Sequence, residues 1–116
     1  MNKLLIIPIW YRKVLIVTPP TDILKSAIKH KIGRSIIKQV KNDPPLKNFA
    51  ACVYYDDDNG RYLLWLEKCC SNDTIVHETN HIVNHMMKFL GARNEHEASA
   101  YTQEYLFRLI RKTIRR

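Results

Sequence analysis

Apolar residues near the N-terminus of the chain follow first the pattern of β-strands and then that of a helix. Residues 4–9 and 14–17 have the apolar positions of strands, joined either as one bent strand or as a tight pair. From residue 21 to about residue 40 the apolar positions recur with the period of a helix, and Pro44-Pro45 follows its end. The first third of the chain is therefore predicted to form β-structure followed by a helix.

The middle of the chain is typical of a β-hairpin. Residues 49–56 and 61–68 are rich in aromatic and branched side chains, which favour strands. Asn59-Gly60 lies between them and is the strongest short signal for a hairpin turn. The acidic run Asp56-Asp57-Asp58 lacks the spaced ligands of a calcium loop, so we assign it to the chemistry of the turn.

Two helices are predicted for the last 45 residues. The first is capped by Asn72 or Asp73 and ends at Gly91, and the second runs from about residue 94 to about residue 113. The order strand, helix, hairpin, helix, helix indicates a two-layer α+β fold in which a small antiparallel sheet carries the helices. At 116 residues the chain is expected to be a single domain, residues 1–116.

The helix that ends at Gly91 is amphipathic. Its polar side includes His77, His81, Asn84, His85 and Lys88. Its apolar side comprises Ile75, Thr79, Ile82, Val83, Met86, Phe89 and Leu90, with Val76 and Met87 at the margins. If the apolar side packs on the sheet, the histidines face away from the core.

Residues 77–81 of this helix have the sequence His-Glu-Thr-Asn-His, an HExxH arrangement. Residues four apart on a helix share one face, so His77 and His81 can reach one metal ion. Glu78 is rotated by about 100° from His77, which suits a carboxylate that polarises a water rather than one that ligates the ion. The spacing therefore predicts a Zn²⁺ site.

Composition favours a compact protein of the cytoplasm. Hydrophobic residues make up 46% and charged residues 26% of the chain, and no segment has the length of a membrane span. The apolar start is interrupted by Pro8 and has no cleavage site for a signal peptide. The three cysteines are expected to be reduced thiols.

The chain has a formal net charge of +8, which favours acidic partners or nucleic acid only weakly. Lys25, Lys29, Lys38 and Lys41 lie on the polar side of the first predicted helix, where solvation is the simpler interpretation. The basic C-terminal run suits a helix C-terminus through the macrodipole, with contact to nucleic acid or a membrane surface as the alternative.

The motifs resemble those of zincin metallopeptidases of the gluzincin type. In that family a glutamate from the helix after HExxH is the third zinc ligand, and residues 97–101, Glu-Ala-Ser-Ala-Tyr, are similar to the E-x-x-A-Y signature of small zincin-like proteins of bacteriophages. The resemblance implies a minimal zincin-like fold with Glu97 as the third ligand. Glu95, two residues earlier and about 160° away around a helix, fits an overlapping E-x-x-A pattern and is the rival ligand.

Catalytic zinc takes three protein ligands and a water, and HExxH supplies two, so a third ligand from elsewhere in the chain is needed. His85 is evenly spaced with His77 and His81, but His77 and His85 lie about 12 Å apart along the axis, too far to share one ion. Tyr101, one turn beyond Glu97, is a candidate to hydrogen-bond a developing oxyanion, with simple packing as its alternative.

The expected function is a zinc-dependent metallopeptidase that hydrolyses a peptide bond through a zinc-bound water activated by Glu78. Its substrate is a peptide or protein, and its compartment is the cytoplasm, that of the host if a phage encodes it. The alternative is a catalytically weak or inactive zincin-like protein that acts by binding a partner protein, as a phage-encoded inhibitor of a host factor would. A third interpretation is a basic nucleic-acid-binding domain, for which no base-reading motif is evident.

Overall fold

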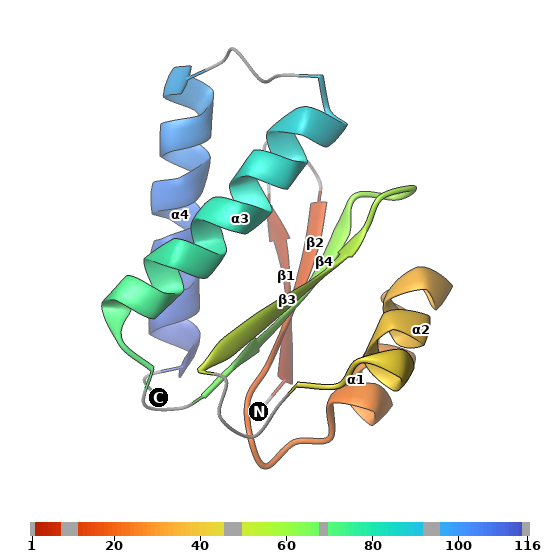
Figure 1. Cartoon of the computed structure of the whole chain (residues 1–116). Coiled ribbons are helices and arrows are strands. Elements are labelled where there is room, and N and C mark those ends of the chain that lie inside the picture. The colour runs from red at the N-terminus through yellow and green to blue at the C-terminus, as the bar shows by residue number, and fades with distance from the viewer. Residues whose placement is uncertain (1, 8–11, 46–49, 68–69, 92–95, 115–116) are drawn as a thin grey trace.

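A computed structural model of the chain describes residues 2–7, 12–45, 50–67, 70–91 and 96–114. The described residues form four strands and four helices (Figure 1). In chain order these are β1 (Asn2–Ile7), β2 (Arg12–Val17), α1 (Ile23–Lys29), α2 (Arg34–Asn42), β3 (Ala51–Asp56), β4 (Arg61–Leu66), α3 (Asn72–Phe89) and α4 (His96–Ile114).

The four strands form one sheet in the order β1-β2-β4-β3. β1 pairs with β2 and β3 pairs with β4 in antiparallel fashion, so the first two strands are a tight pair and the hairpin is confirmed. β2 and β4 are parallel neighbours, however, with Val14 opposite Tyr62 and Val17 opposite Trp65. The α+β class is thus confirmed, whereas the expectation of a wholly antiparallel sheet is wrong. The reason is that the chain crosses over through α1 and α2, forms the edge strand β3, and returns along β4 beside β2.

Helices cover both faces of the sheet, which makes three layers instead of the expected two. Figure 1 shows α3 and α4 on one side of the strands and α1 and α2 on the other. Val14 and Ile16 belong to the core beneath α3 and α4, whereas Leu15 and Val17 belong to the core beneath α1 and α2. Because both faces of β2 are covered, its residues 14–17 form a continuous apolar run rather than an alternating one.

The segment predicted as one helix from residue 21 to residue 40 is two helices. α1 begins after Asp22, whose side chain accepts a hydrogen bond from the Lys25 N–H, and the chain breaks at residues 30–33. Lys31 has a φ of 51° and Gly33 a φ of 128°, values that no helix residue adopts. The helical period of the apolar residues continues across the break, because Ile32 in the turn and Ile36 in α2 both belong to the core. The hydrophobic pattern alone therefore did not reveal the break.

α3 follows its predicted frame closely. Its N-cap is Ser71, one residue before the expected cap, and the Ser71 hydroxyl accepts a hydrogen bond from the Thr74 N–H. Gly91 follows the helix with a φ of 70°, as expected for a residue that stops a helix in the left-handed conformation. The described part of the last helix begins at His96 and continues to Ile114.

Gly60 in the hairpin turn lies against α3, and its replacement is expected to destabilise the fold. Its φ is 62°, and a Cβ atom there would lie 2.7 Å from the Phe89 ring. We predict that Gly60→Ala lowers the free energy of unfolding by about 2–4 kcal/mol, since strain and steric overlap add. Gly91→Ala is the matched control: its φ is similar, but nothing lies within 4 Å, so about 1 kcal/mol is expected. Urea denaturation of both variants measures the difference, and equal losses would contradict the role of Phe89.

Candidate metal centre

The two histidines of the HExxH motif face away from the core, as predicted. His77 and His81 are exposed, whereas Thr79 between them is fully buried and donates its hydroxyl to the Ile75 carbonyl. The Nε2 atoms of His77 and His81 lie 3.1 Å apart, and the ring centroids are 4.6 Å apart with nearly perpendicular planes. The helix therefore directs one nitrogen of each imidazole to the same point outside α3.

This separation fits a shared zinc ion. Two nitrogens bound at about 2.0–2.1 Å in a tetrahedral arrangement are about 3.3–3.4 Å apart. The 3.1 Å distance between His77 Nε2 and His81 Nε2 is close to this value. Both rings are also accessible from solvent, so an ion has an entry path. The pair thus fits two of the ligand positions of a zinc site.

Glu78 lies on the side of α3 that faces strand β3. It is half-buried, and its negative charge contributes to the raised pKa values of two side chains of that strand. The pKa of Tyr55 is raised by burial and then by the Glu78 carboxylate, and the pKa of the Cys52 thiol is raised by burial with a further contribution from Glu78. The carboxylate is therefore near the strand at the edge of the sheet.

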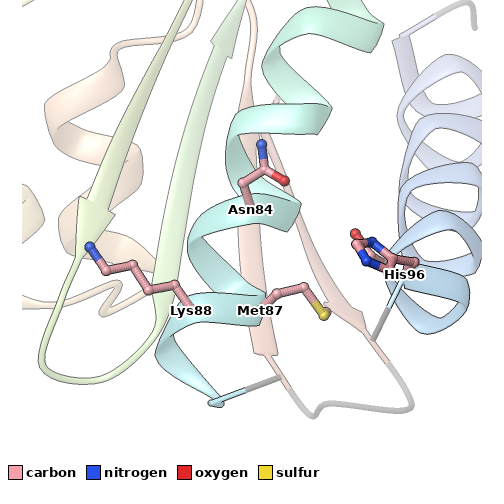
Figure 2. A pocket seen from close by; sticks show the side chains of 5 residues that line it. Asn84, Met87, Lys88 and His96 are labelled. Carbon is pink, nitrogen blue, oxygen red and sulfur yellow. The ribbon is translucent and has the colours of Figure 1, made fainter. Parts of the chain in front are cut away.

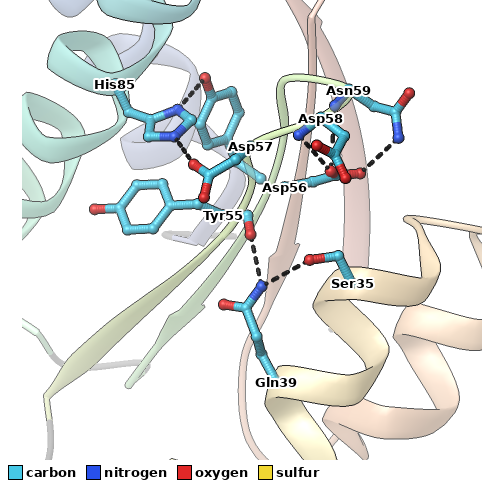
Figure 3. A network of polar contacts seen from close by, with 9 residues as sticks. Ser35, Gln39, Tyr55, Asp56, Asp57, Asp58, Asn59 and His85 are labelled. Atoms are coloured by element: carbon cyan, nitrogen blue, oxygen red, sulfur yellow. Dashed lines mark hydrogen bonds and ion pairs between the residues drawn. The ribbon is translucent and has the colours of Figure 1, made fainter.

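β3 forms that edge of the sheet, and its only strand partner among the described residues is β4. The Asp56 carbonyl accepts a hydrogen bond from the Gly60 N–H across the hairpin, so the carbonyl of the preceding residue, Tyr55, points outward. Gln39 of α2 donates its side-chain amide to the Tyr55 carbonyl at 2.7 Å (Figure 3). One outward carbonyl is thus capped by α2.

Glu97 and Tyr101 lie on α4 and are exposed, Tyr101 to 62%. α4 begins beside the end of α3: His96 and Ser99 line a pocket of about 460 Å³ together with residues of the C-terminal half of α3 (Figure 2). These α3 residues are Asn84, Met87 and Lys88. Asn84 lies three residues and Met87 six residues beyond His81, which corresponds to about 4.5 Å and about 9 Å along the axis.

The structure therefore brings His77 and His81 together but does not bring Glu97 to them. Within residues 2–7, 12–45, 50–67, 70–91 and 96–114, no group of three histidine, cysteine, aspartate or glutamate side chains has the arrangement of a metal site. Glu95, the rival ligand, lies outside the described residues.

A polar network around His85 was not foreseen from the sequence, beyond the exclusion of His85 as a ligand of the same ion. Its Nδ1 atom is hydrogen-bonded to the Tyr62 hydroxyl at 2.9 Å, and its Nε2 atom lies 2.5 Å from an Asp57 carboxylate oxygen (Figure 3). The Tyr55 ring stacks on the imidazole at 4.8 Å. The contacts join α3 to both hairpin strands and to the turn. The position of His85 one turn beyond His81, at the border of the polar side, was the only signal in the sequence.

The acidic run in the turn serves the turn itself, as the sequence indicates. Asp56 is almost fully buried, and its carboxylate accepts hydrogen bonds from the backbone N–H groups of Asp58 and Asn59. A third hydrogen bond comes from the side-chain amide of Asn59. These contacts fix the turn and so place Asp57 against His85.

Tyr62 makes stability sensitive to alkaline pH. Burial raises the pKa of Tyr62 well above its ordinary value of about 10. Its contribution to stability is therefore fully present below about pH 10 and is lost as the pH rises towards the folded pKa, at about 1.4 kcal/mol per pH unit. We expect the wild-type melting temperature to fall more steeply above pH 10 than that of Tyr62→Phe, measured by circular dichroism from pH 8 to pH 11.5. Tyr105→Phe, which changes an exposed tyrosine, is the control, and parallel curves for all three proteins would contradict the prediction.

Comparisons with protein families, with curated proteins and with solved structures found no match for this chain. None of the described helices is long and apolar enough to cross a membrane. The assignment of the candidate site thus depends on its own geometry and chemistry.

Proposed function

We propose that the protein is a zinc-dependent metallopeptidase whose site is built on α3. The observation that carries the proposal is the 3.1 Å separation of His77 Nε2 and His81 Nε2 on an exposed helix face, with Glu78 beside them. Bound zinc would supply Lewis acidity, which polarises a carbonyl and lowers the pKa of a water.

The residues of the chain have distinct roles in this proposal. His77 and His81 would hold the ion, and Glu97 would supply the third protein ligand once α4 has shifted relative to α3. Glu78 accepts the proton of the attacking water, for which its half-buried place next to the exposed histidines is suitable. Tyr101, exposed on α4 one turn after Glu97, donates a hydrogen bond to the oxyanion.

Strand β3 suits an extended peptide or protein substrate. An edge strand presents backbone N–H and C=O groups that can pair with an added strand. Because Gln39 already occupies the Tyr55 carbonyl, such a strand would pair with other outward groups of β3. Glu78 lies close enough to β3 to raise the pKa of Tyr55, after the larger effect of burial. A peptide that pairs with β3 would therefore pass close to the proposed base.

The free thiol of Cys52 agrees with a reducing compartment such as the cytoplasm.

Metal analysis tests the proposal most directly. Protein purified without added zinc is expected to contain about one zinc per chain or to bind one at micromolar concentration. His96→Ala, which changes an exposed histidine outside the pair, should retain the metal, whereas the double variant His77→Ala/His81→Ala should lose it. Failure of the wild-type protein to bind zinc at micromolar concentration would refute the proposal.

A second candidate function is that of a zincin-like protein that acts by binding a partner protein. The observation that favours it is the start of α4, where His96 and Ser99 line a pocket with Asn84, Met87 and Lys88 of α3 and not with the histidine pair. A binding protein needs the surface of α3 and α4 but not the proton acceptor. Its biological effect should therefore survive Glu78→Gln, whereas that of a peptidase should not.

A further inference from the structure

The positive charge of the chain is concentrated in one segment, residues 23–42, which forms α1, α2 and the turn between them. This segment contains six lysine or arginine residues and no aspartate or glutamate. The other 96 residues contain 13 of the 19 lysine and arginine residues and all 11 acidic residues, so their formal charge is only +2. The segment therefore accounts for +6 of the net charge of +8.

The fold places this charge on one surface, here called the α1–α2 surface. The apolar sides of the two helices face the sheet, where Ala27, Ile32, Ile36 and Val40 are at most 2% exposed. The basic side chains are all exposed and comprise Lys25, Lys29, Lys31, Arg34, Lys38 and Lys41. None of the six forms an ion pair with another residue in the described part of the chain. The α1–α2 surface lies on the side of the sheet away from α3 (Figure 1), so it is separate from the candidate metal centre.

The chemistry of the α1–α2 surface distinguishes among polyanionic partners. Insertion into a membrane interface requires a free apolar helix face. In α1 and α2 this face is buried against the sheet, and among the described residues of the two helices only Ile28 is an exposed large hydrophobic residue. Single-stranded nucleic acid is bound through aromatic stacking platforms, and residues 23–42 contain no phenylalanine, tyrosine or tryptophan. The mode of binding that is left is contact of lysine and arginine side chains with phosphates, which is how proteins bind the backbone of a duplex.

We propose that the α1–α2 surface binds double-stranded DNA, mainly through its phosphates. α2 has nine residues and a length of about 13 Å, and its exposed side offers Arg34, Lys38 and Lys41 together with the short polar residues Ser35 and Asn42. The major groove of B-form DNA is about 12 Å wide and admits a helix, whereas the narrow major groove of duplex RNA does not. Asp22 and Asp43 flank the segment at its two ends, and Asp22 is engaged in capping α1. The basic residues of α1 and of the turn would contact phosphates beside α2.

Fluorescence anisotropy with a labelled 20-base-pair DNA of mixed sequence tests this proposal with the full chain. Binding is expected at 50 mM monovalent salt. The logarithm of the association constant should fall against the logarithm of salt concentration with a slope of about −4 to −5, as for release of counterions from about five phosphates. Lys38→Gln/Lys41→Gln should weaken binding about tenfold or more and make the slope shallower by about 2, since two phosphate contacts are lost.

The matched control is Lys88→Gln/Lys112→Gln, which removes the same charge from exposed positions on α3 and α4. Its affinity and slope should stay close to those of the wild type, and circular dichroism should show that both variants fold. The proposal is overturned if the two double variants weaken binding equally, since net charge alone would then explain it. It is also overturned if duplex DNA does not bind at 50 mM salt, or if duplex RNA, single-stranded DNA or vesicles with 30% phosphatidylserine bind more tightly than duplex DNA.

Discussion

Glu78→Gln is expected to lower peptide hydrolysis by about 10²–10⁴-fold while leaving zinc affinity nearly unchanged. A general base contributes rate enhancement of this order, and glutamine has the shape of glutamate without its capacity to accept a proton. Because His77 and His81 project from α3 independently of Glu78, the variant should retain their 3.1 Å arrangement. Cleavage of a random peptide mixture, followed by mass spectrometry, measures the activity without knowledge of the substrate.

A control for this substitution is Glu104→Gln. Glu104 is an exposed carboxylate on α4 that forms a surface ion pair with Arg108, so the same chemical change there should cost at most about 1 kcal/mol of stability and little activity. If Glu78→Gln cleaves peptides at the wild-type rate in the presence of zinc, Glu78 is not the proton acceptor. If only its biological effect persists, and no peptide is cleaved by either protein, the binding function is favoured instead.

The bounds of α3 and its exposed face were predictable because they depend on residues that are close together in the sequence. A capping residue and a left-handed Gly91 indicate where the helix begins and ends, and a sustained apolar side indicates which face packs inward. His77 and His81 then follow from a spacing of four residues. The exposure of both histidines and the closeness of their Nε2 atoms were therefore predicted correctly, and metal binding by this pair stays a prediction.

The remaining features depend on contacts between segments far apart in the chain. The parallel pairing of β2 with β4 follows from the crossover through α1 and α2, which no periodicity encodes. The position of Glu97 relative to His81 depends on how far α4 lies along α3, a matter of helix packing rather than of spacing. The link from His85 to Asp57 spans 28 residues and depends on the turn that Asp56 fixes. Sequence patterns specify faces of elements, whereas tertiary packing decides which faces meet.

Removal of a metal ligand is expected to give the largest loss of zinc affinity. Changes to residues that merely support a ligand lower metal affinity by about 10–100-fold, so His77→Ala and His81→Ala should each cost at least about 100-fold. Glu97→Ala should cost at least about tenfold, because the site then falls from three protein ligands to two. A titration in competition with a chromophoric chelator measures all three variants.

Glu97 as a ligand carries a structural consequence that can be measured independently. In this structure α4 begins beside Asn84, Met87 and Lys88 of α3, and the described residues contain no group of three potential metal ligands, so ligation by Glu97 would require α4 to shift relative to α3. Zinc should then slow amide hydrogen exchange at the start of α4 in the wild type, and Glu97→Ala should remove this protection. Glu95→Ala should cost little beyond a small loss of favourable charge near a helix N-terminus. The reverse pattern in the titration would make Glu95 the ligand. If neither variant loses affinity, no glutamate of this segment is a ligand, and of the proposed ligands only the histidine pair would hold zinc.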